Sequence, residues 1–108
     1  MTNQTLDHEI LDDIVRRVVD VAQPEKIILF GSAARGEMGP NSDIDLLVIK
    51  DEDDARGLSA RIHRELRGVR VAVDAIVVAP RHIERYKNSH ALVIKPALRE
   101  GTVVYEAA

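Results

Sequence analysis

The sequence predicts an α/β (α+β) protein in which a mixed β-sheet is flanked by helices. Three observations indicate this class. An amphipathic helical pattern opens the chain, short apolar runs bounded by turn residues follow it, and further helical patterns separate those runs. The chain has 108 residues, so we expect a single domain over residues 1–108. Aromatic residues make up only 3% of the sequence, so the core must be built from aliphatic side chains.

The first two elements are predicted from residues 5–24 and 26–30. The first segment has apolar residues at helical spacing, Thr5 offers a capping oxygen, and Pro24 marks its end. The second segment, "KIILF", is short, apolar and followed by Gly31, which is typical of a buried strand.

The middle of the chain predicts a strand, a helix and another strand. Residues 43–50, "DIDLLVIK", alternate so that Ile44, Leu46 and Val48 share one face and Asp43, Asp45, Leu47 and Ile49 share the other. Residues 51–68 predict a helix with acidic residues at its start, and residues 69–80 predict a third strand. Two short helices and a last strand at a sheet edge complete the prediction, over 81–89, 91–101 and 102–106.

The bulk composition excludes several classes of protein. The net charge of −3 disfavours a general nucleic-acid binder, and the absence of cysteine excludes disulfides and thiolate metal sites. The polar opening "MTNQTLDHEI" does not resemble a signal peptide, and no apolar run approaches the roughly 18 residues of a membrane span. We therefore expect a cytoplasmic protein that contacts no membrane and has no direct nucleic-acid substrate.

Asp43 and Asp45 form the first candidate site. Residues two apart on a strand share a face, with Cα atoms roughly 6.5 Å apart. Two carboxylates at about that distance repel by about 2.5 kcal/mol at an effective dielectric of about 20, and a bound divalent cation relieves this repulsion. Carboxylate oxygens are hard ligands, which favours Mg²⁺ or Mn²⁺ over softer metals.

The Gly31–Ser32 pair is the candidate phosphate site, and ten residues separate Ser32 from Asp43. Mg²⁺ is usually bound through one or two carboxylates together with substrate phosphates, so phosphates are expected nearby. Glycine allows a ligand to approach the backbone, and a helical turn beginning at Ser32 would present free N–H groups to an anion. Arg35 either contacts a phosphate or pairs with Glu37 at the surface, and the sequence leaves both interpretations open.

Asp74 is the candidate third carboxylate. It is the one charged residue in "VAVDAIVVAP", and a buried unpaired carboxylate is costly. If its strand lies beside residues 43–50, Asp74 can reach the same metal site, support in-line phosphoryl or nucleotidyl transfer, and help to take the acceptor proton. The alternative is an edge-strand residue whose side chain lies in water.

The string Gly31-Ser32, ten residues, then Asp43-Ile44-Asp45 resembles the signature of the nucleotidyltransferases related to DNA polymerase β. The fuller form, "GSAARG" followed by "SDIDLLV", is similar to the minimal nucleotidyltransferase (MNT) group, which includes MntA-type antitoxins of HEPN/MNT toxin–antitoxin systems. The resemblance implies the DNA polymerase β-like nucleotidyltransferase fold. It also implies Asp43, Asp45 and Asp74 as catalytic Mg²⁺ ligands and Gly31, Ser32 and Arg35 as nucleotide-binding residues.

The resemblance further implies an activity and a partner. MntA-type proteins transfer AMP from ATP to a hydroxyl, typically a tyrosine of a HEPN toxin, and thereby silence it. We therefore expect an ATP- and Mg²⁺-dependent protein adenylyltransferase that forms a complex with its toxin. A chain of 108 residues leaves little room for nucleic-acid-binding domains. Two alternatives are adenylylation of a small-molecule hydroxyl and a non-catalytic antitoxin that acts by binding alone.

Other charged groups are interpreted as structural. The acidic run 51–54 is expected to cap a solvated helix rather than to bind metal. The arginines around the second helix are expected to form a solvated face. The four histidines show no ligand spacing and are expected to be surface residues (His8, His63, His82 and His90).

Overall fold

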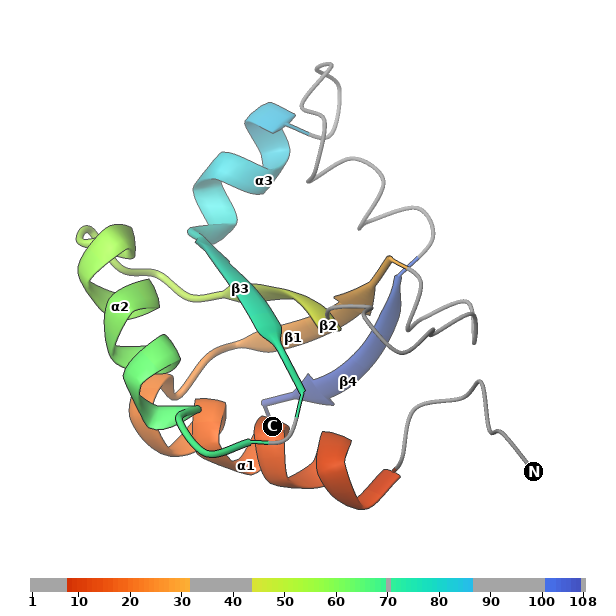
Figure 1. Cartoon of the computed structure of the whole chain (residues 1–108). Coiled ribbons are helices and arrows are strands. Elements are labelled where there is room, and N and C mark those ends of the chain that lie inside the picture. The colour runs from red at the N-terminus through yellow and green to blue at the C-terminus, as the bar shows by residue number, and fades with distance from the viewer. Residues whose placement is uncertain (1–7, 32–43, 70, 87–100, 108) are drawn as a thin grey trace.

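The computed structural model describes residues 8–31, 44–69, 71–86 and 101–107, and it confirms a mixed sheet with flanking helices. Figure 1 shows the strands of the sheet with helices around them. The elements in chain order are α1 (His8–Ala22), β1 (Lys26–Phe30), β2 (Ile44–Ile49), α2 (Ala55–Glu65), β3 (Val73–Val78), α3 (Pro80–Tyr86) and β4 (Thr102–Glu106). No helix in the described ranges is both long enough and apolar enough to cross a bilayer.

The sheet has the strand order β3-β2-β1-β4. β1 pairs with β2 and with β4 in antiparallel fashion, whereas β2 and β3 are parallel. β4 lies at one edge of the sheet, as the sequence predicted, and β3 lies at the other. The parallel pair requires a crossover connection, and α2 provides it.

The two faces of the sheet carry two apolar clusters. Ile44, Leu46 and Val48 of β2 belong to a cluster that also holds buried residues of α1 and α2. Leu47 and Ile49 belong to the opposite cluster, against which Ile83 of α3 packs. The alternation predicted for residues 43–50 is therefore confirmed over the described residues, and Asp45 lies on the same face as Leu47.

Several boundaries differ from the predicted ones. α2 begins at Ala55 because Asp54 is its N-cap, with a carboxylate that accepts a 3.0 Å hydrogen bond from the Gly57 N–H. Asp51 and Asp53, which were predicted to lie at the start of this helix, precede it. They accept hydrogen bonds from Arg81 at 2.6 and 3.0 Å. The 69–80 strand is shorter than predicted, because β3 is confined to Val73–Val78. Thr5 and most of the predicted helix over 91–101 lie outside the described residues.

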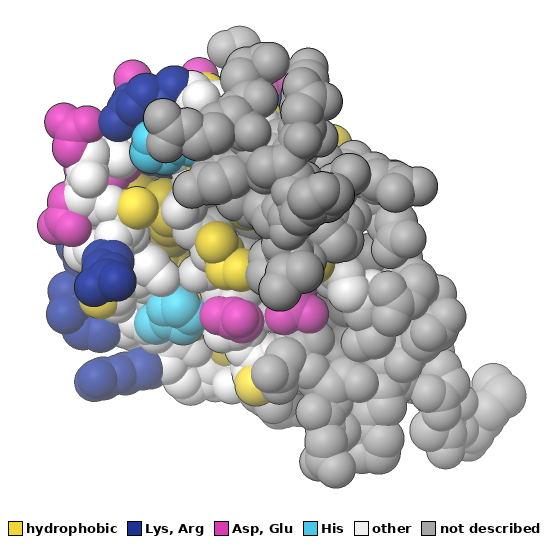
Figure 2. All heavy atoms as spheres, turned by 90° about the horizontal axis from the view of Figure 1, so that it is seen from above, with side chains coloured by type: hydrophobic (Ala, Val, Ile, Leu, Met, Phe, Trp, Pro, Cys, Tyr) yellow, Lys and Arg dark blue, Asp and Glu magenta, His cyan; other side chains and the backbone are white. Residues whose placement is uncertain are grey.

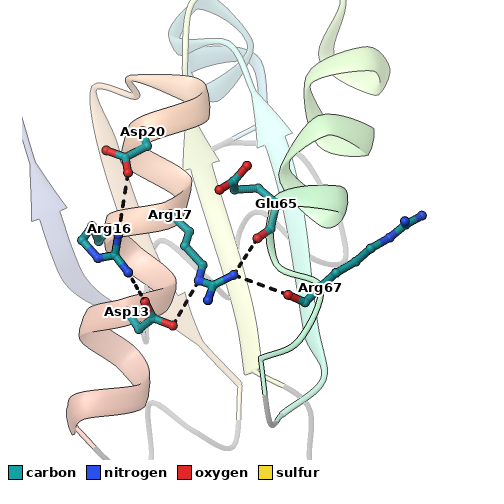
Figure 3. Close-up of polar contacts among 6 residues, drawn as sticks. All are labelled: Asp13, Arg16, Arg17, Asp20, Glu65 and Arg67. Atoms are coloured by element: carbon teal, nitrogen blue, oxygen red, sulfur yellow. Dashed lines mark hydrogen bonds and ion pairs between the residues drawn. The ribbon is translucent and has the colours of Figure 1, made fainter.

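Arg17 joins the first two helices (Figure 3). Its guanidinium donates to the backbone carbonyls of Glu65 at 3.0 Å and Arg67 at 3.4 Å, at the end of α2. It also bonds Asp13, which is paired with Arg16 as well. Burial on its own raises the pKa of Asp13, but the hydrogen bonds and charges of the two arginines outweigh it and hold that pKa below its ordinary value.

Candidate active site

Asp45 and Asp74 face each other across the parallel β2–β3 pair. They are register partners, so their Cα atoms are separated by one strand spacing, roughly 4.8 Å. Both side chains lie on the face that carries Leu47 and Ile76, because residues two apart on a strand share a face. Asp45 is half-buried, whereas the side chain of Asp74 is 61% exposed. The fold thus supplies the strand adjacency on which the third carboxylate depended. The expected burial of Asp74 is wrong, however, because β3 is an edge strand and the side chain is exposed, as in the alternative interpretation.

Gly31 directly follows β1 and lies beside Asp45. Its backbone has a φ of +77°, and a Cβ placed on it would lie 2.5 Å from Asp45 Oδ2. A side chain at this position would therefore collide with the carboxylate as well as strain the backbone. Since Phe30 and Asp45 are register partners, the end of β1 holds the glycine over the start of β2. Glycine is required here so that the carboxylate can lie against the backbone.

His63 is a neighbour of this pair that the sequence interpretation left among surface residues. Its Nε2 lies 4.0 Å from Asp74 Oδ1, and its side chain is 43% exposed. Figure 2 shows acidic and histidine side chains side by side on the face seen from above. The sequence offered only a weak signal for His63. It lies four residues after Ser59 in α2, next to the buried positions Leu58 and Ile62.

The structure brings together Gly31, Asp45 and Asp74 of the predicted site. The other three predicted residues, Ser32, Arg35 and Asp43, lie outside the described residues. Within the described ranges, no group of three or more His, Cys, Asp or Glu residues is arranged as a metal site. Asp45 and Asp74 nevertheless offer the hard oxygen donors that Mg²⁺ prefers. Proteins usually bind Mg²⁺ through one or two carboxylates, with substrate phosphates and water as the other ligands. The donor set therefore fits a metal bound jointly with substrate phosphates.

Comparison with known protein families matches residues 9–102 to the nucleotidyltransferase domain. The chain belongs to this family. Its fold is also similar to a crystal structure of a candidate nucleotidyltransferase from Sulfolobus solfataricus, with a TM-score of 0.60 and 24% sequence identity. That match covers 91% of this chain and 78% of the other, and at this identity it shows the fold alone. No curated protein matches the chain.

Membership of this family supports an enzymatic role as a nucleotidyltransferase. Nucleotidyltransferases generally use a nucleoside triphosphate and a divalent metal, and this chain is a nucleotidyltransferase-family transferase. The membership confirms the superfamily predicted from the Gly31–Asp45 motif. The described part of the predicted site consists of the two carboxylates on β2 and β3 and the glycine that lies against one of them.

Proposed function

We propose that this nucleotidyltransferase transfers AMP from ATP to a tyrosine hydroxyl of a cognate HEPN toxin and acts as the antitoxin. The observation that carries the proposal is the pairing of Asp45 with Asp74 beside Gly31. Two carboxylates on adjacent strands, next to a backbone conformation that favours glycine, suit a metal–triphosphate ligand. The motif resemblance supports the choice of acceptor and partner, and a complex with the toxin follows from it.

Each site residue has a role in the proposed reaction. Asp43, Asp45 and Asp74 would hold Mg²⁺, while Gly31 and Ser32 would cradle the triphosphate with Arg35 beside it. Bound Mg²⁺ would lower the pKa of the acceptor hydroxyl and neutralise the leaving pyrophosphate. The acceptor oxygen forms a bond to the α-phosphorus, the bond between the α-phosphorus and the bridging oxygen breaks, and pyrophosphate leaves. Asp74 is the more exposed carboxylate, so an acceptor can reach it and give it the proton.

The test is label transfer to the product of the neighbouring gene. The protein is incubated with labelled ATP, Mg²⁺ and that product, and the modified residue is located by mass spectrometry. We expect adenylylated tyrosine with the wild type. Loss of a residue that only orients a metal ligand costs roughly 10–100-fold. Asp45→Asn removes a direct ligand, so it should reduce the rate by more than that.

Asp20→Asn is the matched control for the same change of charge. Asp20 is an exposed carboxylate on α1 that lies 4.0 Å from Arg16 Nη1, so its loss should leave transfer unchanged. If the label is found only on a small alcohol, the acceptor is a small molecule and the proposed protein acceptor is wrong. Neutralisation of the toxin that persists in Asp45→Asn without any transfer would show a binding antitoxin and overturn the enzymatic proposal.

A further inference from the structure

The edge strand β3 turns one residue's backbone groups toward α2. The carbonyls of Ala72 and Val78 accept hydrogen bonds from the N–H groups of Ile44 and Lys50, so even-numbered residues of β3 face β2. Residues whose backbone groups face the neighbouring strand alternate along a parallel strand. Ala75, immediately after Asp74, therefore directs its N–H and C=O away from the sheet.

Two side chains of α2 bind both of these groups. Ser59 Oγ donates to the Ala75 carbonyl at 3.1 Å, and the Ala75 N–H donates to His63 Nε2 at 3.4 Å. Residues four apart on a helix lie on one face, so Ser59 and His63 reach the same residue together. We call this arrangement the Ser59–His63 clamp. It supplies Ala75 with the partners that a further strand would otherwise provide.

The hydrogen bonds assign the tautomer of the histidine. Nδ1 lies 2.8 Å from the Ser59 carbonyl, which can only accept, so Nδ1 carries the proton. Nε2 of the neutral ring then has a free lone pair for the Ala75 N–H. The clamp is thus a connected set in which each donor meets an acceptor.

The clamp matters because Asp74 has little else to hold it. Its side chain is 61% exposed, and the 4.0 Å between its Oδ1 and His63 Nε2 is too long for a hydrogen bond. The position of that carboxylate opposite Asp45 is therefore set by the backbone of β3. That backbone is held on one side by β2 and on the other by Ser59 and His63.

We propose that Ser59 and His63 are positioning residues that fix the edge strand at Ala75 and so hold the Asp74 carboxylate in register with Asp45. The proposal rests on the proposed function for its catalytic consequence, but not for its structural and metal-binding consequences. Loss of the clamp loosens the edge of β3 and spreads the two carboxylates. The expected result is weaker metal binding and slower chemistry without loss of the fold.

His63→Leu and His63→Gln form the test pair. Leucine fills a similar volume but cannot accept from the Ala75 N–H, whereas the glutamine side-chain oxygen can. Three quantities are measured in the full chain: hydrogen exchange of the Ala75 amide, binding of Mn²⁺ alone, and kcat and KM for transfer. We expect His63→Leu to speed exchange at least tenfold and weaken Mn²⁺ binding about 10–100-fold, with a matching fall in kcat. His63→Gln should restore all three.

Controls separate the possible outcomes. His8→Leu, on the exposed start of α1, should change none of the three quantities. Ser59→Ala, which removes a single hydroxyl, serves where His63→Leu does not fold, and it should also weaken Mn²⁺ binding. If the rate of hydrogen exchange at the Ala75 amide is unchanged in His63→Leu, the proposal that the clamp holds this residue is wrong. Faster exchange with unchanged Mn²⁺ affinity would show that the clamp only protects the sheet edge, and would overturn the positioning role.

Failure of the proposed function has a different signature. If the wild type transfers no nucleotidyl group to any acceptor, but Mn²⁺ binding still weakens in His63→Leu and recovers in His63→Gln, the positioning role stands and the transferase activity does not.

Discussion

At Gly31 a single missing atom decides whether Asp45 can lie against the backbone. Gly31→Ala would add a Cβ 2.5 Å from Asp45 Oδ2 at a φ of +77°. The left-handed backbone alone costs an L-residue about 1–2 kcal/mol. We therefore expect a loss of about that free energy of unfolding, measured by urea denaturation, together with a loss of nucleotidyl transfer, because the carboxylate must move.

Gly68 provides the matched control for this substitution. Its φ is +89°, but a Cβ placed on it meets nothing within 4 Å. Gly68→Ala should therefore cost a similar free energy of unfolding and leave transfer at the wild-type rate. Equal loss of transfer in both variants would show that reduced stability, and not the contact with Asp45, explains the effect of Gly31→Ala.

At the scale of elements, Arg17 connects α1 to the last turn of α2. Its guanidinium donates to two carbonyls at a helix C-terminus, where a cation is favoured. Arg17→Ala should lower the free energy of unfolding by about 1 kcal/mol, since hydrogen bonds that involve a charged group contribute somewhat more than neutral ones and this site is partly exposed. Chemical denaturation with a fixed m-value measures the change.

Arg16→Ala is the control within the same helix. The side chain of Arg16 is 65% exposed and pairs with Asp13 and Asp20, both on α1. Exposed pairs of this kind contribute little, so we expect a change within about 0.5 kcal/mol. A loss in Arg16→Ala as large as that in Arg17→Ala would contradict the link between the two helices.

The elements also show where sequence reasoning succeeds and where it stops. β1 and β2 were predictable because short apolar runs with alternating faces leave few other solutions. The start of α2 was placed too early because Asp51 and Asp53 pair with Arg81, which is 30 and 28 residues away in the chain. His63 was missed for a different reason: its partner at Ala75 is a backbone group, and the sequence does not show which backbone groups need a side-chain partner.

At the scale of the whole molecule, the order of the strands determines what the site contains. The sequence could state only that Asp74 would join the site if its strand lay beside β2. The parallel crossover through α2 supplies that adjacency, and the register then places Asp74 opposite Asp45. The register is strongly specified, because a shift by one residue would carry Ile44, Leu46 and Val48 out of the larger apolar cluster.

The assembled site should make the stability of the whole chain depend on ligand. A ligand that binds only the folded state, at about 100 times its dissociation constant, contributes about 2.7 kcal/mol of stability. For a domain of this size we therefore expect a nonhydrolysable ATP analogue with Mg²⁺ to raise Tm by about 10 °C. Differential scanning calorimetry measures the shift.

The same rise should require both the metal and the paired carboxylates. Without Mg²⁺ the analogue should raise Tm far less, because the carboxylates then repel the triphosphate instead of sharing a cation with it. Asp45→Asn should reduce the rise in the same way, whereas Asp20→Asn on α1 should retain it. A full rise in Asp45→Asn would place the nucleotide elsewhere in the molecule, because a ligand can stabilise the fold only through the contacts that it makes in the folded state.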